Sequence, residues 1–160
     1  MQVKVKKLSE NAVLPKKAHK TDAGFDLVAT SREIDGDGNI VYGTGLAFEI
    51  PEGYVGYIFP RSSISKNDVI LTNAVGVIDC GYRGEVMAKF KMAIEALQVI
   101  REGDGEQYLP ITKFANGRVY NVGERIAQLI IMPLPEIEME EATELSESDR
   151  GEGGYGSTGN

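Results

Sequence analysis

A carboxylate and an aromatic ring lie close together in a glycine-bearing segment of this 160-residue chain. Asp79 ends an apolar stretch, and Tyr82 follows in the turn after it. A carboxylate of ordinary pKa is ionised at neutral pH, so Asp79 would be able to orient and deprotonate a water molecule. The same residue types also occur in purely structural turns, where aspartate bonds to its own backbone and tyrosine packs.

A second segment, Pro60-Arg61-Ser62-Ser63, follows an apolar stretch and carries a guanidinium and two hydroxyl groups. A planar guanidinium beside hydroxyl and backbone donors suits the oxygen atoms of a phosphate group. The alternative is a turn in which Ser62 or Ser63 caps the N-terminus of a helix.

The chain ends in a glycine-rich stretch, residues 150–160. Glycines allow backbone N–H groups to approach phosphate oxygens closely, and Arg150, Ser157 and Thr158 add side-chain donors. Tyr155 has no core to join there, but its ring would stack on a nucleobase. No Gly-Lys-Ser/Thr sequence follows the glycines, so this is not a P-loop. The alternative is a solvated tail.

Two polar residues complete the set. Asp26, between Gly24 and an apolar stretch, would hold Mg²⁺ directly or through water, or would be a turn residue. Gln128 is the polar member of the apolar run 126–132 and therefore needs a hydrogen-bonding partner.

Composition excludes several classes of protein. A single cysteine excludes an internal disulfide and a zinc site built on several cysteines. Because the chain has one histidine, any mechanism that needs a histidine would depend on His19. No apolar run approaches the length of a membrane span, and the N-terminus lacks the apolar region of a signal peptide, so we expect a cytoplasmic protein. A formal net charge of −7 argues against extended nucleic acid as a partner, although not against a small polyanion.

The elements that must position these residues are mostly strands. Helical periodicity is scarce, and short β-like stretches separated by turn signals favour an all-β barrel or sandwich. The predicted strands are 3–8, 54–59, 69–71, 75–78, 86–90 and 126–132, and a further β-rich stretch, 39–48, is broken by Gly43 and Gly45.

Two hairpins are also predicted. Asn116-Gly117, between 111–114 and 118–120, is the strongest short hairpin signal and predicts a type I′ turn. Residues 73–85 predict a second hairpin around Gly81. The stretch 92–97 fits a short helix or part of a strand equally well. From Glu136 to Asp149 the chain is acidic and without periodicity, which is typical of a solvated connector.

Taken together and in order, five segments resemble the motifs of the trimeric dUTP diphosphatases (dUTPases). The resemblance spans nearly the whole chain and rests on residues 23–27, 60–63, 76–79 with 82–84, 123–129, and 150–159.

This resemblance implies a jelly-roll-like distorted β-barrel with little helix, and a homotrimer with shared active sites. It implies a catalytic domain over 1–135, an acidic connector over 136–149, and a flexible arm over 150–160 that closes over a neighbouring subunit's site. The implied reaction is the hydrolysis of dUTP to dUMP and pyrophosphate with Mg²⁺, without a membrane or nucleic-acid partner.

By position, the resemblance makes Asp79 the general base and places Tyr82 under the deoxyribose. Asp26 supports the metal, through water. The uracil pocket comprises Asn73, Gly76, Val77, Ile78 and Met87. The phosphate contacts are Arg61, Ser62, Ser63 and Gln128, and the closing arm supplies Arg150, Tyr155, Gly156, Ser157 and Thr158.

The chain departs from the family pattern in several places. Ser63 and Gly81 replace a common glycine and a common acidic residue, and Tyr155 stands where phenylalanine is frequent. The stretch between Asp79 and Gln128 is longer than in compact members, and we place the insert at about 93–122. Loops absorb such additions at small cost. Phage members carry inserts in this region, so a phage-type protein with a regulatory protein partner is a further hypothesis.

The nearest alternative is a dCTP deaminase, which shares the fold and an Arg-Ser-Ser signature. That family needs a glutamate where this chain has Lys89, and a lysine cannot replace the carboxylate. The other alternative is a regulatory binding module that uses the insert.

Overall fold

The computed structural model describes residues 1–93, 96–102, 105–111 and 117–153 of the chain. It confirms the all-β, jelly-roll-like fold that the sequence predicts, with one short 3₁₀ helix among the described residues. The elements are β1 (Lys4–Lys7), β2 (Phe25–Val28), β3 (Ser31–Ile34), β4 (Ile40–Gly43), β5 (Leu46–Glu49), β6 (Tyr54–Pro60), η1 (Ser62–Lys66), β7 (Val69–Leu71), β8 (Gly76–Ile78), β9 (Met87–Met92), β10 (Ala96–Glu102), β11 (Gly105–Ile111) and β12 (Arg125–Pro133).

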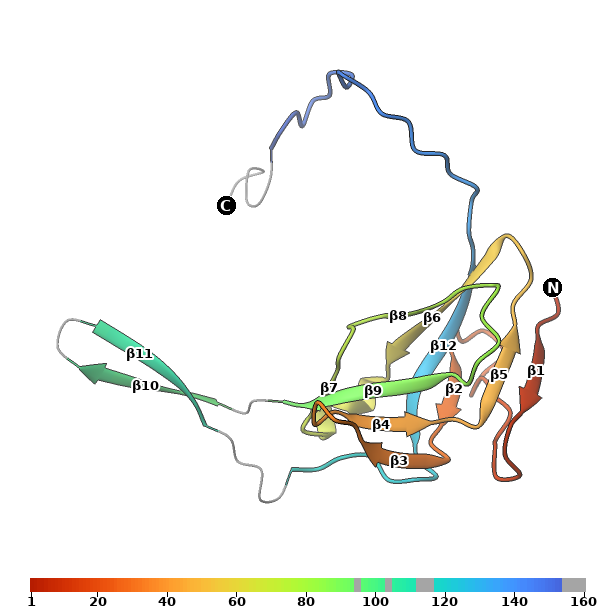
Figure 1. Cartoon of the computed structure of the whole chain (residues 1–160), viewed down its shortest axis with the longest axis horizontal. Helices are drawn as coiled ribbons and strands as arrows, with labels where there is room; N and C mark the ends of the chain where they lie inside the picture. The colour runs from red at the N-terminus through yellow and green to blue at the C-terminus, as the bar shows by residue number, and fades with distance from the viewer. Residues whose placement is uncertain (94–95, 103–104, 112–116, 154–160) are drawn as a thin grey trace.

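Two four-stranded antiparallel sheets form the body of the molecule (Figure 1). One has the strand order β2-β12-β6-β8 and the other the order β3-β4-β9-β7, while β1 pairs with β5. In the first sheet β12 is a central strand, which explains why its apolar run is nearly continuous. Strands that are neighbours in space are distant in sequence, so motifs from both ends of the domain meet on this sheet.

Side chains from both sheets fill one core. Its centre is an aromatic cluster in which Tyr42 meets Phe90 edge-on, with ring centroids 5.7 Å apart, and Tyr120 packs against both. The Tyr42 hydroxyl donates to the Tyr120 carbonyl at 2.8 Å, so the buried phenol is satisfied. The side chains that the first sheet contributes to this core include Leu27, Ile58 and Leu129.

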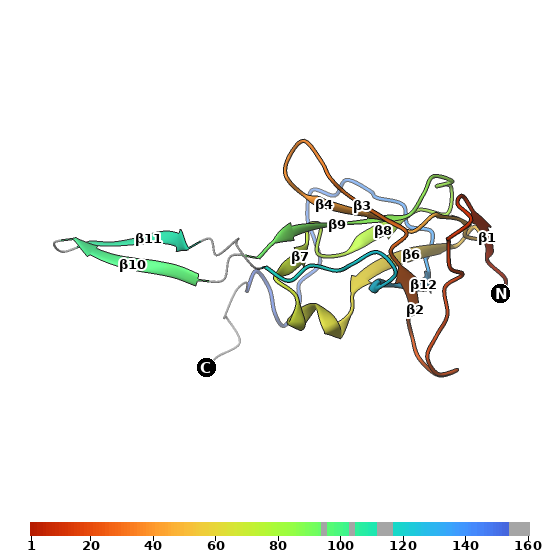
Figure 2. The same cartoon turned by 90° about the horizontal axis from the view of Figure 1, so that it is seen from below.

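A two-stranded hairpin projects from one end of the body (Figures 1 and 2). β10 and β11 pair in continuous register from Ala96↔Ile111 to Glu102↔Gly105. This hairpin lies inside the predicted insert, whereas Tyr120, near the end of that range, belongs to the core.

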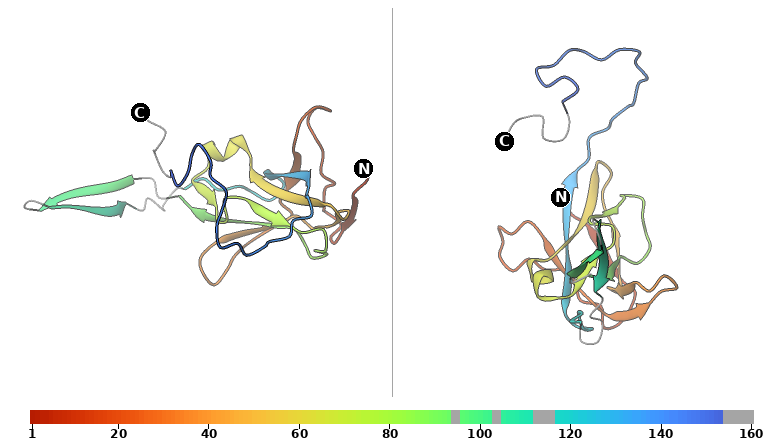
Figure 3. Two further views of the ribbon diagram at one scale, coloured as in Figure 1. Left: turned by 90° about the horizontal axis from the view of Figure 1, so that it is seen from above. Right: turned by 90° about the vertical axis from the view of Figure 1, so that its left-hand side faces the viewer.

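After β12 the chain leaves the body and runs away from it as an extended connector (Figure 3). Residues 132–152 are exposed throughout, as the acidic composition predicts. In the described part of the chain there is no helix long and apolar enough to cross a membrane.

Three local predictions are wrong. Residues 75–78 and 86–90 form β8 and β9, but these strands do not pair with each other, because β8 joins β6 and β9 joins β4 and β7. Residues 118–120 are not a strand, and the predicted turn at Asn116 lies outside the described residues. The cap of η1 is Arg61, without a side-chain capping bond, rather than Ser62 or Ser63.

Candidate functional site

Asp26 is the centre of a hydrogen-bonded cluster that joins three of the predicted motifs. Its Oδ1 accepts from Nε of Arg61 at 2.7 Å and from Nε2 of Gln128 at 3.4 Å. Its Oδ2 accepts from Nη1 of Arg125 at 3.1 Å. The Asp26 side chain is 11% exposed and that of Arg61 is 19% exposed, so this ion pair is largely withdrawn from water.

The strand register explains how these residues meet. Gln128 of β12 lies directly opposite Asp26 of β2, and Arg61 follows the end of β6 on the other side of β12. The register shifts between Arg125 and Ala127, which marks a bulge in β12. Residues three apart in a regular strand face opposite sides, so the bulge explains how Arg125 and Gln128 both reach Asp26.

Gly24 makes room for Gln128. A Cβ at position 24 would lie 3.0 Å from the Cβ and 3.2 Å from the Cδ of Gln128. The glycine of this motif therefore allows the amide side chain to lie against the backbone just before Asp26.

Arg61 also organises the start of η1. Its Nη1 donates to Oγ of Ser63 at 3.2 Å, while Nδ2 of Asn67 donates to the Ser63 carbonyl at 3.0 Å. The guanidinium is thereby held by Asp26 on one side and by a serine on the other. A fixed cation beside the exposed Ser62 is an arrangement that suits a phosphate group.

The segment around Asp79 forms a separate group. Asp79 is exposed, and its carbonyl accepts from the Tyr82 backbone N–H at 3.0 Å, which closes a turn. The Tyr82 hydroxyl donates to the Glu85 carbonyl at 3.0 Å, and the ring lies over Gly84, where an added Cβ would be 2.7 Å from the ring carbon Cζ. One side of the Tyr82 ring therefore lies against the backbone of Gly84.

The residues predicted for base recognition lie on both sides of this turn, with Gly76, Val77 and Ile78 on β8 before it and Met87 on β9 after it. Gly76 pairs with Ile58 of β6, and an added Cβ there would be 3.1 Å from the Ile58 Cβ and 3.4 Å from Nδ2 of Asn73. Val77 and Met87 are apolar yet 58% and 49% exposed. Ile78 is half-buried.

The two groups are not joined within one chain. Among the described residues, no hydrogen bond or ion pair links the Asp26 cluster to Asp79 or Tyr82. Arg150 lies on the exposed connector, where its Nε donates to the Gly153 carbonyl at 3.0 Å. The predicted residues Tyr155, Gly156, Ser157 and Thr158 lie outside the described part of the chain.

The chemistry of the donor set limits how Mg²⁺ would bind. Within the described residues there is no group of three or more Asp, Glu, His or Cys side chains that would hold a metal ion. Both carboxylate oxygens of Asp26 accept bonds from arginines. Asp26 therefore fits a water-mediated contact to an ion carried by a phosphate ligand, which is the usual way Mg²⁺ is held on nucleotides.

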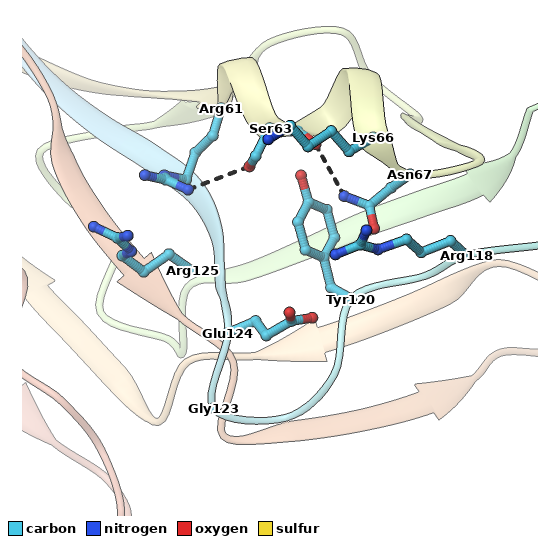
Figure 4. A pocket seen from close by; sticks show the side chains of 9 residues that line it. All are labelled: Arg61, Ser63, Lys66, Asn67, Arg118, Tyr120, Gly123, Glu124 and Arg125. Atoms are coloured by element: carbon cyan, nitrogen blue, oxygen red, sulfur yellow. Dashed lines mark hydrogen bonds between the residues drawn. The ribbon is translucent and has the colours of Figure 1, made fainter.

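Sequence reasoning missed a pocket beside this cluster. A cavity of about 260 Å³, which we call the basic pocket, is lined by Arg61, Ser63, Lys66, Asn67, Arg118, Tyr120, Gly123, Glu124 and Arg125 (Figure 4). Lys66, Arg118 and Tyr120 carried no motif signal because they come from segments that meet only in the folded chain.

Lys89, the residue that argues against deamination, is occupied elsewhere. Its Nζ lies 2.8 Å from Oδ2 of Asp35. The Lys89 ammonium and the Asn39 amide hold the pKa of the Asp35 carboxyl well below its usual range, and the carboxylate in turn raises the pKa of Lys89. The position therefore carries a paired cation and no catalytic carboxylate.

Known proteins are similar to this chain over nearly its whole length. The dUTPase family model matches residues 10–104 and 108–159. The deoxyuridine 5'-triphosphate nucleotidohydrolase of Clostridium tetani is 39% identical over 159 residues, which cover 98% of this chain and 96% of that protein. A solved mutant dUTPase of Staphylococcus bacteriophage 80alpha, with dUpNHpp, is 31% identical with a TM-score of 0.76 and covers 99% of both chains.

A mutant dUTPase from phage phi11 of S. aureus is 31% identical with a TM-score of 0.66, over 90% of this chain and 98% of that one; its structure is described as revealing the coordination of a structural Mg(II) ion. With the family model matching most of its residues, this chain belongs to the dUTPase family.

Proposed function

We propose that this protein hydrolyses dUTP to dUMP and pyrophosphate. The observation that carries the proposal is the Asp26 cluster, which gathers Arg61, Ser63 and Gln128 as phosphate donors in a chain of the dUTPase family. Hydrolysis of a triphosphate depends mainly on positioning and charge stabilisation, and these residues supply both.

Asp79 is the proposed general base. Its exposed carboxylate takes a proton from a water molecule as the water oxygen forms a bond to the α-phosphorus. The bond from the α-phosphorus to the bridging oxygen breaks, and pyrophosphate leaves with the electron pair. No histidine or cysteine is required for this step, which accords with an exposed His19.

We propose that the phosphate groups are bound by two sets of residues. The body supplies Arg61, Ser62, Ser63 and Gln128, and the C-terminal arm supplies Arg150, Gly156, Ser157 and Thr158. When bound to the triphosphate, Mg²⁺ supplies further charge neutralisation, with Asp26 contacting it through water. Tyr82 is proposed to lie under the deoxyribose and leave no room for a ribose 2′-hydroxyl, while Tyr155 covers the uracil. Main-chain groups from Asn73 to Ile78, together with Met87, read the base.

We propose that the active unit is a homotrimer with shared sites. The support is that Asp79 and the Asp26 cluster share no contact among the described residues of one chain, and that the connector leaves the body (Figure 1). A mixture of two inactive variants, Asp79→Asn and Arg61→Gln, refolded together tests this. Partial recovery of activity supports shared sites, and no recovery contradicts them.

We also propose a cytoplasmic location, because dUTP is a highly charged nucleotide that does not cross membranes. The projecting β10–β11 hairpin favours a second role, the binding of a regulatory protein partner, since it forms a two-stranded sheet of its own and extends from the body.

The experiment that tests the proposed function is the release of pyrophosphate from dUTP, UTP, dCTP and dTTP with Mg²⁺. We expect turnover of dUTP alone, and an Asp79→Asn variant slower by a factor on the order of 10² to 10⁴, since a positioned base contributes that much. Asp37→Asn, a change of the same type on an exposed turn, is the matched control. Equal turnover of UTP, or release of ammonia from dCTP, would overturn the proposal.

A further inference from the structure

The basic pocket carries more positive charge than the phosphate contacts named so far. Four cations line it, Arg61, Lys66, Arg118 and Arg125, against the single carboxylate of Glu124. Glu124 is already engaged, because its Oε2 accepts from the Asn121 backbone N–H at 2.6 Å. Asp26, beside the pocket, pairs with both Arg61 and Arg125. Four cations therefore face two carboxylates, and the remaining positive charge favours an anionic ligand.

A buried hydroxyl points into the same pocket. Tyr120 is 3% exposed, and its hydroxyl has no hydrogen-bonding partner among the described residues. Figure 4 shows the Tyr120 hydroxyl directed toward η1, between the side chains of Ser63 and Asn67, with the Arg118 guanidinium beside the ring. Buried hydroxyl groups in proteins are almost always bonded, so an unpartnered one marks a place where a ligand or an ordered water accepts.

Arg118 is held in place at its backbone by Asp68. The Arg118 N–H donates to Oδ2 of Asp68, and the Asp68 N–H donates back to the Arg118 carbonyl at 2.8 Å. Asp68 lies two residues after the end of η1, so Arg118 is fixed relative to Ser63 and Lys66. This reciprocal pair fixes the backbone from which the Arg118 side chain reaches the pocket.

We infer that the basic pocket is an anion site for a phosphate or pyrophosphate group, in which Arg118 and the Tyr120 hydroxyl are binding residues beside Arg61 and Lys66. The inference rests on the proposed function for the identity of its ligand. It goes beyond that function because it assigns binding roles to residues from outside the five motifs.

Two molecules would supply a phosphate anion to this pocket. The anion is either the terminal part of the bound nucleotide's triphosphate or free pyrophosphate after the reaction. The pocket shares Arg61, Ser63 and Arg125 with the Asp26 cluster, so it is contiguous with the proposed phosphate contacts.

Calorimetric titration of the full-length protein with inorganic pyrophosphate, dUMP and a non-hydrolysable dUTP analogue tests this. Arg118→Gln removes the charge at similar length, and Tyr120→Phe removes only the hydroxyl. We expect Arg118→Gln to weaken pyrophosphate binding about tenfold and Tyr120→Phe about threefold, as for single charge-assisted and neutral hydrogen bonds. Binding of dUMP, which lacks the distal phosphates, stays unchanged. Thermal unfolding verifies that each variant folds.

Lys91→Gln is the matched control, because Lys91 is an exposed cation on β9 that does not line the pocket. If the triphosphate fills the pocket, the Arg118 and Tyr120 variants will bind both the dUTP analogue and pyrophosphate more weakly. If only the product fills it, these variants will bind only pyrophosphate more weakly. No pyrophosphate binding by the native protein, or equal weakening by Arg118→Gln and Lys91→Gln, would overturn the inference. Titration does not need turnover, so pyrophosphate binding without dUTP hydrolysis would refute the proposed function and leave the pocket standing.

Discussion

Arg61 and Asp26 form a largely buried ion pair, with Nε of Arg61 2.7 Å from Oδ1 of Asp26 and both side chains less than one-fifth exposed. The pair connects a residue of β2 with the residue that caps η1. Arg125 and Gln128 also donate to Asp26, which supports the proposal that Asp26 orients phosphate donors and would contact a metal ion only through water.

Asp26→Asn tests this orienting role. Asparagine keeps the shape but removes the charge, so the bonds from Arg61 and Arg125 weaken. We expect the free energy of unfolding to fall by about 1.5–3 kcal/mol, the value of a hydrogen bond to a charged group. The KM for dUTP should rise more than the kcat falls, as measured by steady-state kinetics over a range of Mg²⁺ concentrations. Unchanged stability and KM would contradict the central position of Asp26.

Gly84→Ala should disturb Tyr82. An added Cβ at position 84 would lie 2.7 Å from the Tyr82 Cζ, so the ring must move. If Tyr82 excludes the ribose 2′-hydroxyl, the ratio of kcat/KM for dUTP over UTP will fall in this variant. Gly81→Ala is the matched control, because nothing lies within 4 Å of its added Cβ and its backbone is free of positive φ. Equal ratios in both variants would remove the reason for assigning sugar discrimination to Tyr82.

The projecting hairpin should be dispensable for folding. The Ala93 N–H donates to the Asp68 carbonyl at 2.8 Å and the Asp68 N–H to the Arg118 carbonyl at 2.8 Å, so both ends of the segment meet at one residue. Replacing residues 94–116 by two glycines should leave a cooperatively folding domain with dUTP turnover within about threefold of the native protein, because closing a shorter loop costs little. Loss of cooperative thermal unfolding would show that the hairpin supports the core.

The buried phenol of Tyr42 should make the stability of the folded protein depend on pH in the alkaline range. Burial raises the pKa of the Tyr42 phenol above its usual value of 10.0. The folded state therefore favours the neutral phenol, and this contribution to stability is complete below pH 10 and is lost as pH rises through the folded-state pKa.

Urea titration of the native protein and of Tyr42→Phe tests that response. The variant loses the bond to the Tyr120 carbonyl and should be about 1 kcal/mol less stable at pH 7. The difference between the two proteins should shrink above pH 10. A constant difference from pH 7 to 11 would contradict a buried, titrating phenol.

Local patterns predicted the strands well. β6, β7 and β12 fall on the apolar runs that predicted them, because the side chains that these strands bury in the core are apolar. The polar exception, Gln128, was rightly expected to need a partner, and its partner is Asp26.

Pairing between distant segments was not predictable in the same way. Residues 73–85 look like a hairpin because both arms are β-like, yet β8 and β9 join different sheets. The Asn116-Gly117 signal is local, whereas residues 118–120 are held by Asp68 and by the packing of Tyr120 in the core. The meeting of Arg125 and Gln128 on Asp26 depends on a bulge, and a bulge is set by both partner strands.

The fate of the water oxygen tests the central claim most directly. Hydrolysis of dUTP by the native protein with Mg²⁺ in ¹⁸O-labelled water, analysed by mass spectrometry of both products, reports which phosphorus is attacked. We predict one labelled oxygen in dUMP, unlabelled pyrophosphate, and near loss of both products with Asp79→Asn. Label in pyrophosphate, or full activity of Asp79→Asn, would contradict attack on the α-phosphorus by water that Asp79 activates.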